Sequence, residues 1–165
     1  MKALPKPIRT RMESPIGPLT LVADGAALVG IYFEHHSKGG PPPAAEGEAP
    51  AFAIARRQLD AYFAGRRTSF DVALAPRGTA FQTHVWALLQ RIPYGQTTTY
   101  GALAAEMGRP SAVRAVAGAV ARNPISILIP CHRVVGADGG LTGFAGGLAV
   151  KAGLLGLEQG GVLAL

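Results

Sequence analysis

The chain contains one cysteine, Cys131, within the apolar segment 127–135 (ILIPCHRVV), and His132 and Arg133 follow it directly. A thiol with its ordinary pKa of about 8.5 is mostly protonated at neutral pH, so it acts as a nucleophile only beside a base or in a positive field. A lone cysteine is more often a small buried hydrophobic residue. The adjacent imidazole and the apolar run nevertheless favour a reactive thiol at the base of a pocket.

The apolar run predicts an extended strand, in which neighbouring side chains point to opposite faces. Direct contact between Cys131 and His132 is then unfavourable, and a bridging water is the simpler path for the proton. The imidazole also needs a carboxylate to orient it, and Glu158 is the best candidate further along the chain.

The composition indicates a folded protein. With 165 residues, 48% hydrophobic and 16% charged, the chain can form one ordinary domain or a small domain beside a larger one. One cysteine excludes an internal disulfide, and the four histidines show no metal-ligand spacing, so we expect no metal site. Because nothing resembles a signal peptide or the roughly 20 apolar residues of a membrane span, we expect a cytoplasmic protein. We also expect a monomer.

The net charge is positive, with 16 basic against 10 acidic side chains. Residues 77–165 carry seven of the basic and three of the acidic ones, and six of these seven cations are arginine. A basic surface attracts polyanions, and arginine suits phosphate geometry. Charge alone still favours simple solubility over a nucleic-acid partner.

Residues 1–76 have the pattern of a small α+β domain. Two strands within 14–34 meet at Asp24-Gly25, a strong hairpin signal. The segment 37–50 is rich in proline, glycine and alanine and lacks periodicity, which predicts a loop.

A helix is predicted next, because residues 51–64 carry their apolar side chains on one face. The alternation of apolar residues over 70–74 predicts a half-buried strand. The segment 75–78 is then a credible boundary between the first domain and residues 77–165.

The second domain is mostly helical by its pattern. Thr79 and Gln82 can form a capping box at the start of a helix over 79–92. Residues 146–158 predict a last helix that carries Lys151 and ends at Glu158.

Two short helices, over 100–107 and 111–121, flank a tight turn and predict a helix-turn-helix. Ser111 is the expected cap of the second helix. That helix is rich in alanine and glycine, so a partner could approach it closely, and Arg114 is the one long cation in its first two turns.

IPCHRV, preceded by Asn-Pro and followed by a glycine-rich turn and a helix, resembles the O6-alkylguanine-DNA alkyltransferases. FQTHVWALLQRIPYGQTTTYGALAAEMG, SAVRAVAGAVARNP and GGLAVKAGLLGLE resemble that family's helices, and SPIGPL matches a common bacterial start. The resemblance is close over 79–158 and loose over 14–74. It implies an α+β protein: an N-terminal ribonuclease H-like domain with an antiparallel sheet, and a helical domain with the helix-turn-helix.

The same resemblance implies the catalytic roles. Cys131 would accept the alkyl group from guanine O6, and His132 would deprotonate it through water, held by Glu158. Tyr100 would donate its hydroxyl proton toward guanine N3. Asn123 would be the hinge that braces the recognition helix against the active-site segment.

The implied pocket would bind the alkylated base. The carbonyls of Cys131 and Val134 would read the guanine amino group, and the Ala145 amide would bind O6. Phe144 stands where relatives usually have tyrosine, so stacking persists without the hydroxyl. The remaining candidate substrate contacts are Val120 and Lys151.

The implied partner is double-stranded DNA that carries O6-alkylguanine, or O4-alkylthymine, bound through the minor groove without sequence preference. Arg114 would fill the space left by the flipped nucleotide. The other candidate DNA contacts are Ser111, Ala112, Ala115 and Gly118.

A thioether is a poor leaving group and the chain has no second cysteine, so we expect one turnover per molecule without a metal or organic cofactor. Three alternatives remain. A non-catalytic alkyltransferase-like protein would lack the reactive cysteine. A thiol hydrolase usually holds its Cys and His far apart in sequence. A plain DNA-binding regulator would leave the thiol idle.

Overall fold

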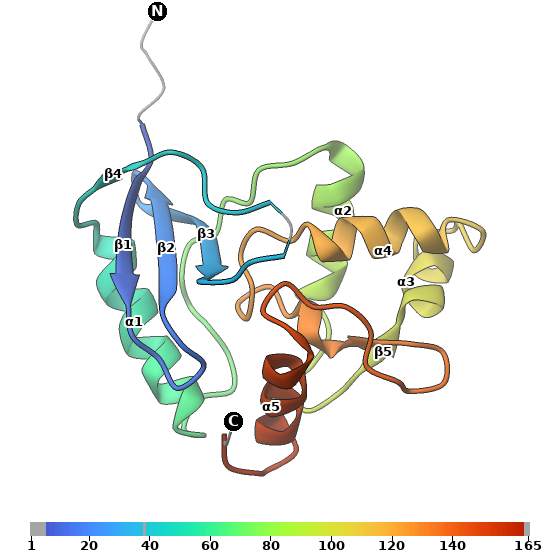
Figure 1. The fold of residues 1–165 in the computed structure, drawn as a ribbon. Helices are drawn as coiled ribbons and strands as arrows, with labels where there is room; N and C mark the ends of the chain where they lie inside the picture. The colour runs from blue at the N-terminus through green and yellow to red at the C-terminus, as the bar shows by residue number, and fades with distance from the viewer. Residues whose placement is uncertain (1–5, 38, 164–165) are drawn as a thin grey trace, which may run out of the picture.

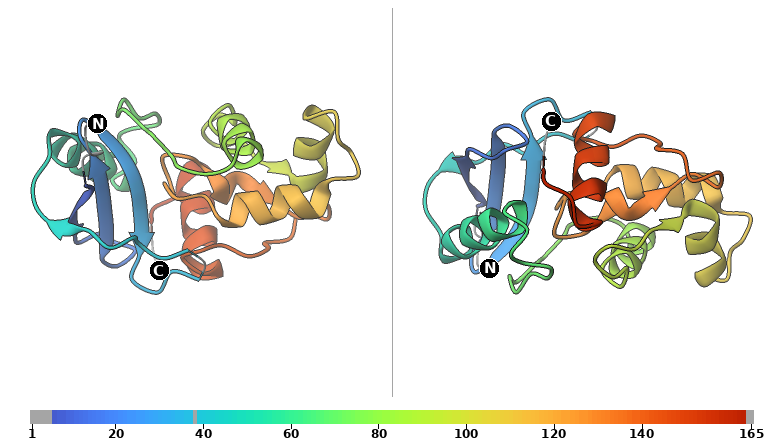
Figure 2. Two further views of the ribbon diagram at one scale, coloured as in Figure 1. Left: turned by 90° about the horizontal axis from the view of Figure 1, so that it is seen from above. Right: turned by 90° about the horizontal axis from the view of Figure 1, so that it is seen from below.

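The computed structural model describes residues 6–37 and 39–163. A sheet covered by one helix lies beside a mostly helical part (Figure 1). The last helix, α5 (Leu148–Glu158), lies between the sheet and the other helices of the second part, as both views in Figure 2 show. The expected α+β class is confirmed.

The sheet has the strand order β3-β2-β1-β4. The predicted hairpin is present: β2 (Leu19–Asp24) and β3 (Ala27–Phe33) pair antiparallel, and Gly25 takes the positive φ of 60° that the turn requires. The strand β1 (Ile8–Met12) was not predicted, since two arginines interrupt its apolar pattern. It pairs antiparallel with β2 and parallel with the two-residue β4 (Ala45–Glu46).

The helix α1 (Pro50–Phe63) lies where it was predicted and packs on one face of the sheet. Its predicted apolar face is buried: Phe52, Ala55, Leu59, Tyr62 and Phe63. The predicted strand over 70–74 is wrong. Only Leu74 forms a bridge, with Leu28, because the chain touches the edge of β3 at that single point before it crosses to the second part.

The helical part begins with α2 (Ala80–Leu89), and the predicted capping box is present because the side chains of Thr79 and Gln82 each accept from the other residue's backbone. The short strands β5 (Thr98–Thr99) and β6 (Val134–Val135) pair in parallel. They hold the start of the helix-turn-helix against the segment that follows the cysteine.

The helix-turn-helix consists of α3 (Tyr100–Glu106) and α4 (Val113–Ala121). The prediction that Ser111 caps the second helix is wrong. The chain still forms a turn there, in which the Ala112 amide donates to the Arg109 carbonyl at 2.9 Å, so Ala112 is the N-cap residue and no side chain caps the helix.

Two hydrogen bonds fix the end of α4. Trp86 on α2 donates its indole N–H to the Ala119 carbonyl at 2.8 Å, and Ile31 on β3 donates its amide to the Pro124 carbonyl at 2.8 Å. The segment that leads from α4 to Cys131 is therefore anchored to both parts of the molecule. Within the described ranges, no helix is long and apolar enough to cross a membrane.

Candidate active site

The segment that carries the cysteine is not the strand predicted from its apolar run. After α4 the chain makes tight turns, and Cys131–Arg133 forms a single turn of 3-10 helix. Ile127 takes a φ of 76°, which is rare for a β-branched residue and marks a strained backbone.

Asn123 braces this strained segment at both ends. Its side-chain oxygen accepts from the Ile125 amide at 3.0 Å, and its side-chain nitrogen donates to the Ile129 carbonyl at 2.7 Å. The side chain is buried, so these bonds compete with little water. The residue expected to act as a hinge thus fixes the turns between α4 and the thiol.

The 3-10 turn separates Cys131 from His132. Successive side chains in such a helix project about 120° apart, rather than to opposite faces as in a strand. The ring nitrogen Nε2 of His132 hydrogen-bonds Glu158, and Nδ1 has no partner among the residues that the structure describes. The expected lack of direct contact is consistent with this geometry, although the strand argument for it was wrong.

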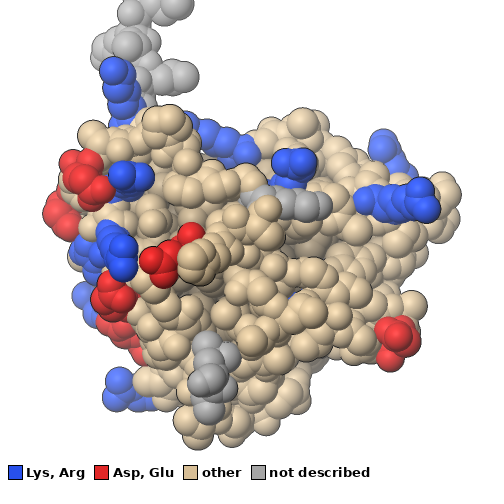
Figure 3. Space-filling view, in the orientation of Figure 1, with Lys and Arg blue, Asp and Glu red and all other residues tan. Residues whose placement is uncertain are grey.

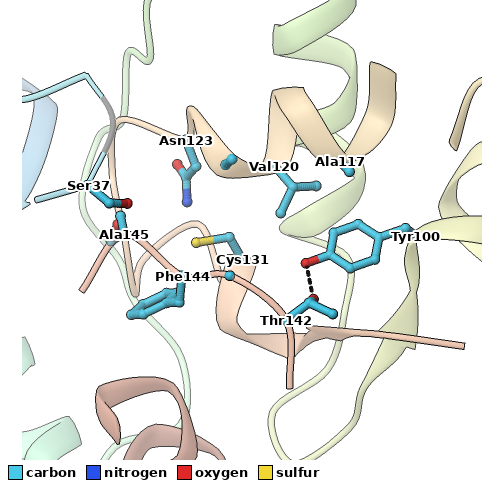
Figure 4. A pocket seen from close by; sticks show the side chains of 12 residues that line it. Ser37, Tyr100, Ala117, Val120, Asn123, Cys131, Thr142, Phe144 and Ala145 are labelled. Atoms are coloured by element: carbon cyan, nitrogen blue, oxygen red, sulfur yellow. Dashed lines mark hydrogen bonds between the residues drawn. The ribbon is translucent and has the colours of Figure 1, made fainter. Parts of the chain in front are cut away.

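A pocket of about 400 Å³ opens at the thiol. As Figure 4 shows, α4 and Asn123 form one wall, Tyr100 and Thr142 lie at one end, and Ser37 and Ala145 lie at the other. Six of the predicted site residues line this pocket together: Tyr100, Val120, Asn123, Cys131, Phe144 and Ala145.

The pocket is lined mainly by apolar groups. The Phe144 ring contacts the Phe33 ring edge to face at 5.4 Å, so a residue of the N-terminal sheet supports the pocket wall. The Tyr100 hydroxyl lies 2.7 Å from the Thr142 hydroxyl, and either oxygen can be the donor. Thr142 was not predicted.

Burial raises the pKa of the Cys131 thiol, whereas Asn123, Lys151 and Ser126 act to lower it. Ser126 was also missed by the sequence analysis. Its hydroxyl is buried and has no hydrogen-bond partner within the described part of the chain, although the residue lines the pocket. The thiol therefore has polar neighbours that can stabilise a negative charge.

The structure places Lys151 and Val134 outside the pocket lining. Lys151 is buried, and its ammonium donates to the carbonyl of Val134 at 2.6 Å and to that of Thr142 at 3.1 Å. Burial lowers the pKa of Lys151, and the nearby Cys131 acts to raise it. Lys151 thus ties the segment after the thiol to the loop that carries Thr142.

Behind the 3-10 turn, Glu158 is the centre of a buried network. His132 Nε2 lies 2.6 Å from Glu158 Oε2, which is the predicted pairing. Arg133 donates through Nε to Oε1 at 2.7 Å and through Nη2 to Oε2 at 3.1 Å. Tyr62 from α1 donates its hydroxyl to Oε2 at 2.6 Å. The roles of Arg133 and Tyr62 were not predicted.

This network sets the charge states. Burial acts to raise the pKa of Glu158, but hydrogen bonds from His132, Arg133 and Tyr62 outweigh it and hold the pKa at about 2. Burial lowers the pKa of His132, against the opposing effect of Glu158. At neutral pH the carboxylate is ionised and can only accept, so Nε2 carries the imidazole proton and Nδ1 is the free base.

The candidate DNA contacts lie on another surface. Ser111, Arg114, Ala115 and Gly118 are exposed on or beside α4, Ala112 is half-buried, and none of the five lines the pocket. Basic side chains lie over α4 and its ends at the upper right of Figure 3, where acidic side chains are not seen. Among the residues described, no cluster of three His, Cys, Asp or Glu side chains could hold a metal ion.

Comparisons with known proteins agree over nearly the whole chain. Two family models match, the ribonuclease-like domain of 6-O-methylguanine DNA methyltransferase over residues 8–76 and its DNA-binding domain over residues 80–160. The methylated-DNA–protein-cysteine methyltransferase of Methanosarcina acetivorans is 52% identical over 147 residues, which cover 88% of this chain and 94% of that one. The protein of the same name from Mycobacterium bovis is 47% identical over 154 residues, or 90% of each chain.

A solved structure extends the agreement to the fold. Mycobacterium tuberculosis OGT, in a crystal structure of its complex with DNA, superposes with a TM-score of 0.87 at 46% identity, covering 93% of this chain and 94% of that one. The sequence matches and the superposition span both the sheet and the helical part that holds Cys131. The chain therefore belongs to the 6-O-methylguanine DNA methyltransferase family.

Proposed function

We propose that the protein repairs DNA by moving an alkyl group from O6 of guanine to Cys131. One observation carries this proposal: a single thiol opens into a mainly apolar pocket of about 400 Å³, and the next residue of the same turn, His132, forms a buried imidazole–carboxylate pair with Glu158 of α5. A pocket of this size and polarity suits a flat base that carries an alkyl group. The family membership supports the same reaction.

The target atom lies inside stacked DNA, so the nucleotide must be rotated out of the duplex at a cost of a few kcal/mol. The small exposed residues of α4 allow close approach to the minor groove, as minor-groove binders require. Arg114, which is exposed and lies outside the pocket, would occupy the vacated space in the duplex. Contacts to phosphates would give affinity without sequence preference.

The proton leaves the thiol first in this mechanism. His132 Nδ1 accepts it through a water, because Nε2 is occupied by the ionised Glu158. The thiolate forms a carbon–sulfur bond as the bond between that carbon and O6 breaks, and the electron pair of the broken bond stays on the base. Tyr100, at the end of the pocket, would neutralise the developing charge by donating its proton toward N3.

The product ends the reaction cycle. Alkyl transfer leaves a thioether on Cys131, and no second cysteine exists in the chain to remove the alkyl group. We therefore propose that each molecule reacts once. A thiol hydrolase would instead release its product and continue.

The test uses duplex DNA that contains one O6-methylguanine. After incubation, the protein mass should rise by one methyl group, and peptide mapping should place it on Cys131. The Cys131→Ser variant, which keeps the shape of the side chain, is the matched control and should gain nothing. A methyl group found on another residue, or no gain with wild-type protein, contradicts the proposal.

A further inference from the structure

Tyr62 reaches from the N-terminal part of the molecule into the network behind the thiol. It lies in the last turn of α1, is fully buried, and is separated from Glu158 by 96 positions in the sequence. Aromatic rings fix its orientation, with Phe63 at 5.6 Å, Phe70 at 5.4 Å and Tyr94 at 6.3 Å between ring centres. The proposed reaction assigns it no part.

The hydroxyl of Tyr62 shares one oxygen with the imidazole. Both groups lie 2.6 Å from Glu158 Oε2. Burial, and then the charge of Glu158, raise the pKa of Tyr62, so its hydroxyl keeps its proton and is a permanent donor. Short bonds from a neutral hydroxyl to a buried carboxylate are among the stronger hydrogen bonds in proteins.

A second donor on the same oxygen has an electrostatic consequence. The hydroxyl draws negative charge from Oε2, so less remains to stabilise a positive charge on His132. Since the Glu158 carboxylate acts to raise the pKa of His132, a donor that competes for this carboxylate acts in the opposite direction. The Tyr62 hydroxyl thus favours the neutral imidazole, which is the form that can accept the thiol proton.

The charges of Arg133 and Lys151 also act to lower the pKa of His132, so the Tyr62 hydroxyl adds to their effect through a short hydrogen bond from a neutral group. Arg133 also donates to Oε2, but at 3.1 Å and as part of a fork whose shorter bond goes to Oε1. Tyr94 lies near the network, yet its hydroxyl makes a long 3.5 Å bond to the Leu157 carbonyl rather than to Glu158. Among the described residues, the titratable and charged groups that act on His132 or Glu158 are Tyr62, Tyr94, Arg133 and Lys151.

We propose that Tyr62 is a positioning residue for the reaction at Cys131: its hydroxyl holds Glu158 Oε2 and limits how tightly that carboxylate retains a proton on His132. The ribonuclease-like part of the chain thereby supplies one component of the proton relay. The effect of Tyr62 on repair rests on the proposed function. The effect of its hydroxyl on His132 can be tested without that function.

The first test follows the histidine directly. Histidine-labelled wild-type protein, Tyr62→Phe and Tyr94→Phe are titrated by NMR, and the His132 signal is identified from a His132→Gln sample. In Tyr62→Phe the pKa of His132 should be higher than in wild type. Tyr94→Phe removes a neighbouring hydroxyl that does not contact Glu158, so it should titrate like wild type. An unchanged His132 titration in Tyr62→Phe overturns the proposal.

A second variant separates the effect of the hydrogen bond from an effect on packing or folding. Replacing Tyr62 alone by 3-fluorotyrosine keeps the ring and makes the hydroxyl a stronger donor. The pKa of His132 should then fall below the wild-type value, the opposite direction from Tyr62→Phe. A shift in the same direction for both variants would indicate a general packing effect and would overturn the proposal.

The second test measures the rate of benzyl transfer from free O6-benzylguanine to Cys131 as a function of pH. For Tyr62→Phe, the rate on the acidic side of the profile should fall about fivefold, the net effect of one typical hydrogen bond, and should change less than about twofold on the neutral plateau. A uniform fall at every pH would mean a structural role only. If no variant and no wild-type protein transfers the benzyl group, the proposed function fails while the histidine titration still decides the role of Tyr62.

Discussion

The two sides of the 3-10 turn at Cys131–Arg133 are built differently. The pocket side is mainly apolar and includes the Ser126 hydroxyl, which has no partner in the described structure. The inner side is ionic, and its Glu158 carboxylate is hydrogen-bonded by His132, Arg133 and Tyr62, while Nδ1 of His132 has no partner among the described residues. The contrast indicates a division of work: the base and its carboxylate are held rigidly, whereas the thiol is left free to change its partner when it reacts.

The largest expected effect comes from a substitution in the hydrogen-bonded network on the inner side of the turn. Glu158→Gln removes the charge that pairs with Arg133 and exchanges one of the two acceptor oxygens for an amide donor, so the group that orients His132 is weakened. An unpaired buried charge should cost about 3 kcal/mol of unfolding free energy. The loss of the oriented base should slow alkyl transfer about 100-fold. Urea denaturation and single-turnover kinetics measure the two effects, and a variant as stable as wild type would contradict the importance of the ion pair.

The next largest effect is on the repair of duplex DNA, and it comes from a residue of α4 that lies outside both sides of the turn. Arg114→Ala should slow repair of duplex DNA about 100-fold, because nothing then fills the space of the flipped nucleotide. The reaction with free O6-benzylguanine should be nearly unchanged, since Arg114 does not line the pocket. Arg109, exposed in the turn before α4, offers the matched control as Arg109→Ala. Equal losses on both substrates would rule out the assigned role of Arg114.

A smaller change tests the pocket side. The Ser126 hydroxyl acts to lower the pKa of the Cys131 thiol. Ser126→Ala should therefore raise that pKa and slow alkyl transfer near neutral pH about fivefold, without a large loss of stability. The rate of thiol alkylation by iodoacetamide across pH reports the thiol pKa. A lower pKa in the variant would show that the hydroxyl does not stabilise the thiolate.

The last expected effect follows from the same carboxylate as the first and concerns stability at acid pH. Glu158 has a pKa of about 2 in the folded protein, below its ordinary 4.5, so it stabilises the fold above pH 4.5 and this contribution is lost as the pH falls toward 2. His132, whose pKa is also lowered, adds a loss of the same sign that begins below its ordinary 6.5. Melting temperatures of wild type and Glu158→Gln across this range should converge at low pH. Parallel curves would contradict the assignment.

Local signals in the sequence were sufficient for much of the fold. Asp24-Gly25 predicted the hairpin, and the Thr79–Gln82 capping box predicted the start of α2, because both depend on neighbours within a few positions. Ser111 shows the limit of such signals, since the turn at Arg109 moves the helix start past it. The apolar run before Cys131 predicted a strand because periodicity does not distinguish a short buried strand from buried turns.

The active site could be predicted where the reaction requires a catalytic group to have a particular kind of partner. A histidine base needs a carboxylate, and Glu158 was identified on that ground. Tyr62 could not be found in this way, because its apolar neighbours on α1 predict a core aromatic and its partner lies 96 positions away. Ser126 carried no signal either, since its place beside the thiol depends on the strained turn at Ile127.

The central claim is a single irreversible transfer to Cys131, and a stoichiometric titration tests it most directly. A fixed amount of protein is mixed with increasing amounts of duplex DNA carrying a radiolabelled methyl group on guanine O6, and the label bound to protein is counted at completion. The account predicts a plateau at one methyl group per protein molecule, with excess DNA left unrepaired. Continued loss of O6-methylguanine beyond one equivalent, with methyl groups released into solution, would contradict it.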